Sequence, residues 1–109
     1  MDALPEFIET AVFARTCEAL LSDDEYLALQ TALIENPEAG DVIPRTGGAR
    51  KLRWARPGTG KSGGLRTIYY WRSHAGQIWM LLAYPKSAKE NLTNREKNAL
   101  RDFIRSIDP

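Results

Sequence analysis

Hydrophobic residues near the N-terminus follow one short strand pattern and then two helical patterns. Residues 6–10 are typical of a strand, and residues 12–21 repeat apolar side chains at helical spacing. Ser22 begins a capping box, because its hydroxyl can accept a backbone amide and Glu25 can accept the Ser22 amide in return. The second helix should end by Asn36, since the proline that follows disfavours helical geometry. We expect these two helices to form an antiparallel hairpin.

The central part of the chain has the patterns of three strands, at residues 50–55, 65–72 and 77–84. In the first of them, Leu52 and Trp54 alternate with Lys51 and Arg53, so the two pairs should face opposite sides of a sheet. The second is rich in β-branched and aromatic residues, and the third is almost continuously apolar, which favours an internal position. Glycine, proline and polar residues dominate the connections, at residues 38–48, 56–64, 73–76 and 85–89.

A further helix is predicted near the C-terminus. Thr93 and Glu96 form a second capping box. The residues after it form one apolar stripe, Leu100, Phe103, Ile104 and Ile107. The order of elements is therefore a strand, two helices, an antiparallel meander and a helix. This order predicts a single α+β domain over residues 1–109, with two N-terminal helices and a C-terminal helix packed on a twisted antiparallel sheet.

The formal net charge is only +1, but the charges are segregated along the chain. Residues 1–44 contain ten acidic residues and one basic residue, whereas residues 45–89 contain ten basic residues and no Asp or Glu. These basic side chains are interleaved with aromatic residues, among them Trp54, Tyr69, Tyr70, Trp71 and Tyr84. Arginine, lysine and aromatic rings together suit phosphates and unstacked bases, which indicates a nucleic-acid surface. The alternative is that the acidic half covers the basic half within the folded domain.

Other features of the composition narrow the class of protein. Cys17 is the only cysteine, so no disulfide can form within the chain, which fits a reducing compartment. The N-terminus lacks the layout of a signal peptide. The longest apolar run, residues 78–83, is too short to span a bilayer. We therefore expect a cytoplasmic protein that does not enter a membrane.

Three ordered motifs occur between residues 40 and 70: Gly40-Asp41-Val42-Ile43, then Gly47-Gly48-Ala49-Arg50-Lys51-Leu52-Arg53, and then Gly60-Lys61-Ser62-Gly63-Gly64-Leu65-Arg66-Thr67-Ile68-Tyr69-Tyr70. Together they resemble the RelE/ParE toxin superfamily, and in detail its HigB-like branch, and the resemblance extends over nearly the whole chain. It implies the RelE-like microbial RNase fold. As function, it implies the toxin of a type II toxin–antitoxin system, a ribosome-dependent endoribonuclease that cleaves mRNA in the ribosomal A site and so inhibits translation. A cognate antitoxin would hold such a toxin inactive.

The resemblance also implies where the active site lies. The basic catalytic positions of the family fall on Lys51, Arg53, Arg66 and Lys86. Better-known RelE members have a tyrosine shortly after the last strand, which residues 90–92 do not supply, so Tyr84 at the strand end is the candidate for its place. We expect RNA contacts from the other basic residues nearby, Arg50, Arg56, Lys61 and Lys89.

RNA can be cleaved by its own 2′-hydroxyl, which attacks the adjacent phosphate, and the enzyme must stabilise the phosphorane and help the leaving oxygen. Residues 42–89 contain no Asp, Glu or Cys, so neither a metal site nor a cofactor is expected there. We interpret Arg66 as a phosphate clamp, and the alternative is a salt bridge to the acidic N-terminal helices. Lys51 and Arg53 share one strand face. A lysine that is desolvated among like charges can have a lowered pKa and then act as a proton acceptor. The alternative for this pair is a solvated edge strand protected by charge.

Three features that suggest other chemistry have simpler interpretations. His74 lies in the predicted hairpin turn, far from the start of the strand that carries Arg66. Residues 55–62 mimic a phosphate-binding P-loop, but a strand follows them where such a loop would open a helix. Cys17 lies on an apolar helix face and is interpreted as a core residue.

Two other functions stay open at this point. A ParE-like toxin has the same fold but poisons gyrase, and it would cause DNA-damage signalling while messages stay intact. A non-catalytic relative would bind RNA with a steep salt dependence and cut nothing. The absence of the family's tyrosine keeps this second alternative in view.

Overall fold

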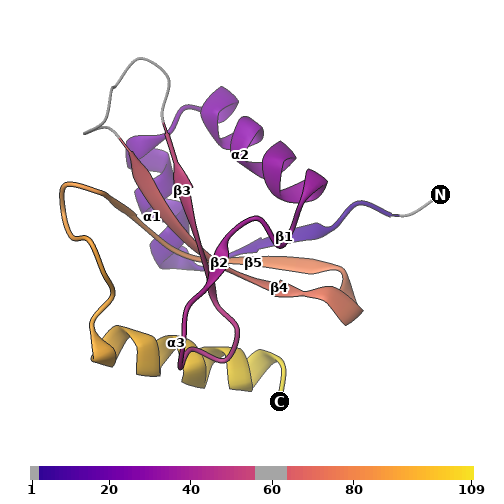
Figure 1. Ribbon diagram of the computed structural model, residues 1–109. Coiled ribbons are helices and arrows are strands. Elements are labelled where there is room, and N and C mark those ends of the chain that lie inside the picture. The colour runs from indigo at the N-terminus through magenta and orange to yellow at the C-terminus, as the bar shows by residue number, and fades with distance from the viewer. Residues whose placement is uncertain (1–2, 56–63) are drawn as a thin grey trace.

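The computed structural model describes residues 3–55 and 64–109, and it has the α+β architecture that the sequence predicts (Figure 1). Along the chain the elements are β1 (Glu6–Glu9), α1 (Ala11–Leu20), α2 (Asp23–Glu35), β2 (Asp41–Val42), β3 (Arg50–Trp54), β4 (Leu65–Arg72), the short 3-10 helix η2 (Ser73–Ala75), β5 (Gln77–Pro85) and α3 (Asn94–Ile107). Both predicted capping boxes are present, at Ser22 and Thr93. No helix in these two ranges is long and apolar enough to cross a bilayer.

The strands form one five-stranded sheet in the order β1-β5-β4-β3-β2. The β5–β4 and β4–β3 pairs are antiparallel, as predicted. β2 adds an antiparallel pair with β3 that was not predicted, and β1 joins β5 in parallel, so the sheet is mixed. The alternation of apolar residues reports which face of a strand is buried and not the direction of its neighbour, so it could not reveal this pairing. The two residues of β2, Asp41 and Val42, also lie in a connection that was predicted to consist of turns.

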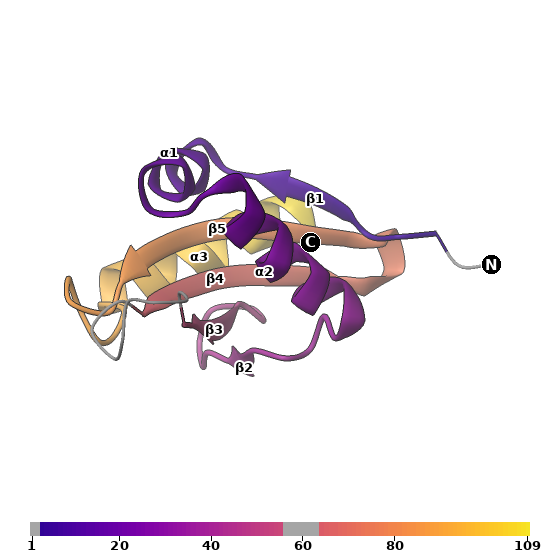
Figure 2. The same ribbon diagram turned by 90° about the horizontal axis from the view of Figure 1, so that it is seen from above.

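Helices cover both faces of the sheet. Figure 1 shows α1 and α2 on one side and α3 on the other, and each side has its own cluster of buried apolar residues. Figure 2 shows α1 end-on while α2 runs across the view, so these helices cross and do not form the predicted antiparallel hairpin. They meet through the rings of Phe13 and Tyr26, whose centroids lie 5.9 Å apart.

A bulge in β5 decides which way the end of this strand faces. Leu81 has no partner opposite it in β4, because the register shifts there by one residue. Thr10 holds this point, since its hydroxyl donates to the Leu81 carbonyl at 2.8 Å and its amide donates to the Met80 carbonyl at 3.1 Å. Every later residue of β5 therefore changes face. Tyr84 consequently points to the side of α3, whereas strict alternation from Met80 would turn it toward α1 and α2.

The connection from α2 to β2 is fixed by a hydroxyl group of the core. The Tyr69 hydroxyl accepts the Gly40 amide at 2.9 Å and donates to the Pro37 carbonyl at 2.8 Å. A Cβ atom at Gly40 would lie 2.9 Å from both the Lys51 carbonyl oxygen and the Tyr69 ring, so a larger residue does not fit there. These contacts hold β2 beside the start of β3, at the edge of the sheet.

Candidate active site

Three of the predicted catalytic side chains form one row across the sheet. Arg53 of β3 lies opposite Arg66 of β4, which in turn lies opposite Tyr84 of β5. Residues directly opposite each other in neighbouring strands point to the same face of a sheet. Here it is the face that α3 partly covers, and Lys51 lies on the same face one row away, opposite Ile68. We use the name basic row for the three aligned residues Arg53, Arg66 and Tyr84 together with Lys51 from the adjacent row on the same face.

Arg66 has the most unusual environment in the basic row. Arg66 is only 8% exposed to solvent, and its Nε atom is buried without a hydrogen-bond partner among the described residues. In the part of the chain that the structure describes, no carboxylate lies within ion-pair distance of its guanidinium. The two N-terminal helices, α1 and α2, lie on the opposite face of the sheet, so they do not provide the salt bridge considered as the alternative. A buried charge without a counter-charge is costly, and a bound anion would remove that cost.

Tyr84 is buried next to this arginine. Its residue is 5% exposed, and its hydroxyl has no hydrogen-bond partner among the described residues. Burial raises the pKa of Tyr84, and the positive charge of Arg66 only partly opposes that shift. The phenol therefore keeps its proton at neutral pH and is available as a hydrogen-bond donor.

The loop after β5 adds a lysine to the same place. The Lys89 Nζ atom lies 5.1 Å from the centroid of the Tyr84 ring and pairs with the carboxylate of Glu96 in α3. Burial alone would raise the pKa of Glu96, but the hydrogen bonds from Lys89 and from the Thr93 amide lower it overall. Glu96 therefore stays ionised, and it anchors Lys89 over the tyrosine.

The remaining predicted residues are placed in different ways. Lys86 is exposed, and its backbone amide donates to the Gly64 carbonyl at 2.9 Å, so it lies where β4 begins and β5 ends, close to the basic row. Arg50 faces the other side of the sheet and donates to the carbonyl groups of Gly40, at 2.8 Å, and Glu38, at 3.2 Å. The structure thus does not bring Arg50 to the other candidates. Two predicted RNA contacts lie outside the described residues, Arg56 and Lys61.

A groove with a volume of about 500 Å³ opens beside the basic row. Lys51 and Arg53 from β3 line it together with Lys97 from α3 and Asp41 from β2. The sequence analysis did not identify Lys97 or Asp41 as members of the site. The segment with the basic residues contains no carboxylate, but the pairing of β2 with β3 brings Asp41 directly opposite Lys51. The capping box at Thr93 could have located Lys97, since it places that residue in the first turn of the helix, close to the end of the preceding loop.

Two titratable groups outside this region, Cys17 and His74, have structural surroundings that explain them. Cys17 is buried in the core, where burial raises its pKa to about 11. His74 is exposed, and its Nε2 atom lies 2.9 Å from an oxygen of Asp108. Within residues 3–55 and 64–109, no three His, Cys, Asp or Glu side chains gather in a way that would hold a metal ion.

The chain is similar to known proteins both in sequence and in fold. The family model described as the RelE toxin of the RelE/RelB toxin–antitoxin system matches residues 7–108. Among solved structures, a double-mutant form of the E. coli toxin RelE in the free state is similar, with a TM-score of 0.60 and 12% sequence identity. That match covers 81% of this chain and 90% of the E. coli chain. At this identity the likeness concerns the fold, and it confirms the RelE-like α+β fold that the sequence predicted.

Proposed function

The chain belongs to the RelE toxin family, and from this premise we propose that it is a ribosome-dependent endoribonuclease that cleaves mRNA in the ribosomal A site and so inhibits translation. Its nucleophile would be the 2′-hydroxyl of the RNA itself, which requires neither a metal ion nor a cofactor. We place its action in the cytoplasm, where the ribosomes are, and its control in a cognate antitoxin protein.

One observation carries this proposal. Arg66 is buried, it has no carboxylate partner among the described residues, and it lies directly opposite a second arginine, Arg53. Two adjacent arginines repel each other unless an anion lies between or above them. Their planar guanidinium groups suit the oxygens of a phosphate, and most of all a phosphorane with two negative charges. The basic row is therefore better suited to bind a phosphodiester than to support the fold.

The other members of the site would then divide the remaining tasks. Tyr84, with its raised pKa, would donate a hydrogen bond or a proton to the leaving 5′-oxygen. Lys51 would contribute positive charge to the groove along which the RNA backbone runs, and it is also the candidate proton acceptor. Lys86, which is exposed at the same end of the sheet, would bind the phosphate on the leaving side.

Controlled expression in a bacterium would test the proposal, with growth followed over time and mRNA 5′ ends mapped by primer extension. The wild type is compared with Arg66→Ala and with Arg15→Ala. Arg15 is an exposed arginine of α1 on the opposite face of the sheet, so its replacement removes the same charge away from the site. We expect arrest and new cuts within translated regions for the wild type and Arg15→Ala, and neither for Arg66→Ala.

The other outcomes have distinct meanings. Arrest with cuts in the Arg66→Ala variant would remove Arg66 from the active site. Arrest with intact messages and DNA-damage signalling would point to gyrase as the target. If cells that contain soluble wild-type protein grow normally and their messages stay intact, the proposed nuclease activity is contradicted. The remaining interpretation is then a non-catalytic RNA-binding relative.

A further inference from the structure

We propose a second phosphate-binding site for RNA, separate from the groove beside the basic row and formed by Arg45 and one face of α3. The proposal rests on the proposed function in that it takes RNA as the ligand, but it concerns binding and needs no cleavage. We call this place the Arg45 hollow. It has a volume of about 410 Å³ and is lined by Arg45, Asn94, Lys97, Asn98 and Arg101.

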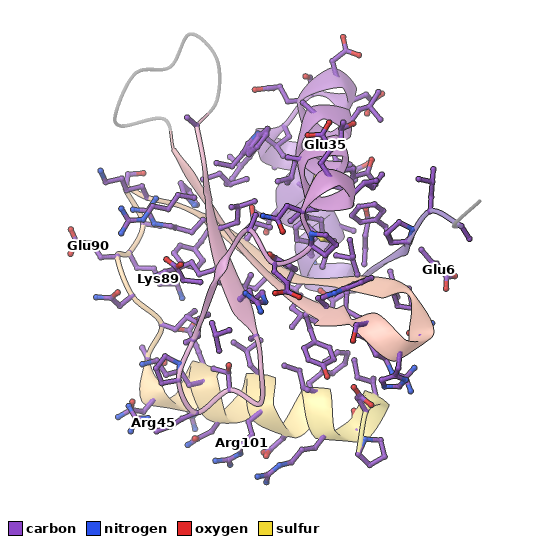
Figure 3. The ribbon with its side chains drawn as sticks, turned by 45° about the vertical axis from the view of Figure 1, so that its right-hand side comes forward. Glu6, Glu35, Arg45, Lys89, Glu90 and Arg101 are labelled. Atoms are coloured by element: carbon purple, nitrogen blue, oxygen red, sulfur yellow. The ribbon has the colours of Figure 1, made fainter. Side chains whose placement is uncertain are left out.

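The lining of the Arg45 hollow comes from two segments that are far apart in the sequence. The four residues of α3 follow the spacing i, i+3, i+4 and i+7, so they share one face of the helix. Arg45 comes from the connection between β2 and β3. Figure 3 shows Arg45 and Arg101 beside each other along the outer side of α3. The fold therefore collects side chains here that sequence reasoning did not connect.

The charge of the hollow favours an anion. Its lining contains three cationic side chains, those of Arg45, Lys97 and Arg101, and no carboxylate. Asp102 lies 3.3 Å from the Arg101 guanidinium, but its side chain is 69% exposed, and a pair at such an exposed position is weak and screened by salt. Asn94 and Asn98 add side-chain amides, which commonly contact phosphate and sugar oxygens together with arginine and lysine.

The backbone at Arg45 gives a second, independent reason. Arg45 has a φ of 66°, in the left-handed region that is unfavourable for residues other than glycine. Its neighbour Thr46 is fully buried, donates its hydroxyl to the Ile43 carbonyl at 2.7 Å and accepts the Ala49 amide at 3.1 Å. This buried network imposes the unfavourable conformation on an arginine that asparagine or glycine would accommodate better. Such strain is commonly found where a side chain is presented to a ligand.

The position of the hollow indicates which anion it binds. Lys97 lines both the Arg45 hollow and the groove that contains Lys51 and Arg53, so the two sites adjoin. A chain of phosphates that occupies the groove can therefore extend over Lys97 into the hollow. The chemistry is that of an RNA phosphodiester, and it can come from two sources. One is the message itself beyond the cleavage point, and the other is the structural RNA of the ribosome.

The test uses 2′-O-methyl RNA, which keeps its phosphates but lacks the attacking hydroxyl and so reports binding alone. An oligonucleotide of about three nucleotides fills the groove alone, whereas one of about twelve nucleotides is long enough to reach the Arg45 hollow as well. The variant is Arg45→Asn with Arg101→Gln, since asparagine tolerates the left-handed backbone and glutamine supports a helix. The matched control is Arg95→Gln with Arg105→Gln, which removes two exposed arginines from the same helix outside the hollow. Binding is measured by fluorescence anisotropy over a range of salt, and binding to purified small ribosomal subunits is measured beside it.

If the message occupies the hollow, the variant should bind the longer oligonucleotide about tenfold more weakly, with the short one unaffected and the salt slope reduced by about 1.4. If ribosomal RNA occupies it, only binding to the small subunit should fall. Equal losses in the control, or no loss with any of the three ligands, would overturn the proposal. Circular dichroism checks folding, and Arg45→Asn alone replaces the double variant if that one unfolds. A wild type that binds as described but cuts no message would refute the proposed nuclease and leave this site standing.

Discussion

At the scale of single residues, the sequence predicted that Lys51, Arg53 and Arg66 lie close together but not the environment that surrounds them. Alternation in the first predicted strand placed Lys51 and Arg53 on one face, and the observed register brings Arg66 to them. The low exposure of Arg66 and Tyr84 could not be predicted in this way. It depends on α3 and on the loop after β5, which pack over this end of the sheet from a distant part of the sequence.

The burial of Arg66 without a counter-charge makes a prediction about stability. Replacing a buried, unpaired charge by an apolar side chain of similar length removes a desolvation cost. We expect Arg66→Met to raise the free energy of unfolding by about 1 kcal/mol, measured by urea denaturation, while mRNA cleavage is lost. Arg72→Met is the control on the same strand and face. Arg72 lies 3.6 Å from Asp108 and donates to Gln77 at 3.2 Å, so its loss should destabilise. Destabilisation by both variants would show that Arg66 has a structural partner after all.

Tyr84 supports a separate prediction about the proton donor. Its hydroxyl is buried without a partner, so Tyr84→Phe removes an unsatisfied group and should leave the thermal midpoint unchanged or raise it. The rate of cleavage on programmed ribosomes should fall about 100-fold, because the leaving oxygen loses its donor. Cleavage at the wild-type rate by Tyr84→Phe would exclude the phenol from the chemistry and direct attention to Lys86.

At the scale of elements, the fold follows the predicted helices and strands closely, and the departures lie where local pattern carries no information. The two-residue strand β2 is too short to show alternation, and its place depends on the Tyr69 hydroxyl and on Gly40. The bulge at Leu81 lies inside an almost continuous apolar run, in which no change of face is visible in the sequence. Without that bulge, Tyr84 would point away from Arg66, so one additional residue completes the candidate site.

Thr10 allows the bulge to be tested apart from the site. Its hydroxyl caps α1 by accepting the Phe13 amide at 3.0 Å and also donates to the Leu81 carbonyl. Thr10→Val should lower the free energy of unfolding by about 1 to 2 kcal/mol, and it should also slow cleavage because the end of β5 is less well held. Ser22→Ala is the control, since it removes the exposed cap of α2 at a cost of about 1 kcal/mol with no contact to β5. Cleavage is measured as a single-turnover rate. If both variants slow it equally, the contact of Thr10 with the bulge has no specific effect on activity.

The end of α3 is fastened to the hairpin between β4 and β5 by one carboxylate. Asp108 accepts the Tyr70 hydroxyl at 2.6 Å and lies 2.9 Å from the Nε2 atom of His74, with Arg72 at 3.6 Å. The Tyr70 hydrogen bond is the largest of the effects that lower the pKa of Asp108 below its ordinary value of 3.8, and His74 and Arg72 add to it. The ionised carboxylate is thus favoured by folding.

This shift gives a pH dependence with a definite sign. A carboxyl group with a lowered pKa in the folded state contributes stability above its unfolded pKa, and the contribution is lost as pH falls through the folded value. We expect the free energy of unfolding of the wild type to fall more steeply below about pH 4 than that of Asp108→Asn, so that the two curves converge in acid. Urea titrations at a series of pH values would measure this. Parallel curves over the whole range would show that Asp108 does not contribute in its ionised form.

At the scale of the whole molecule, the segregation of charge along the sequence becomes a segregation between faces. Helices α1 and α2 cover one face of the sheet, and α3 lies on the other (Figures 1 and 2). The first turn of α2 is acidic. The basic row lies on the face of α3, and the groove and the Arg45 hollow are lined by residues of β2, β3, α3 and the loops beside them. The sequence left open whether the acidic half neutralises the basic half. The sheet separates most of the two sets of charges, with contacts at its edge, where Arg50 lies 4.0 Å from Glu38 and Asp41 lies opposite Lys51. Asp41 is the only acidic residue in the described part of the chain that lines the groove.

This arrangement predicts that the position of a negative charge matters more than the net charge. Asp41→Asn and Glu35→Gln each raise the net charge by one, but the first changes the groove and the second an exposed position on α2. At physiological salt, charges act over about 8 Å, so the far face is screened from RNA in the groove. We expect Asp41→Asn to strengthen binding of 2′-O-methyl RNA about two- to fivefold and Glu35→Gln to leave it unchanged, by anisotropy at physiological ionic strength. If both variants strengthen binding equally, RNA responds to the total charge of the protein, and the groove then has no special part in holding it.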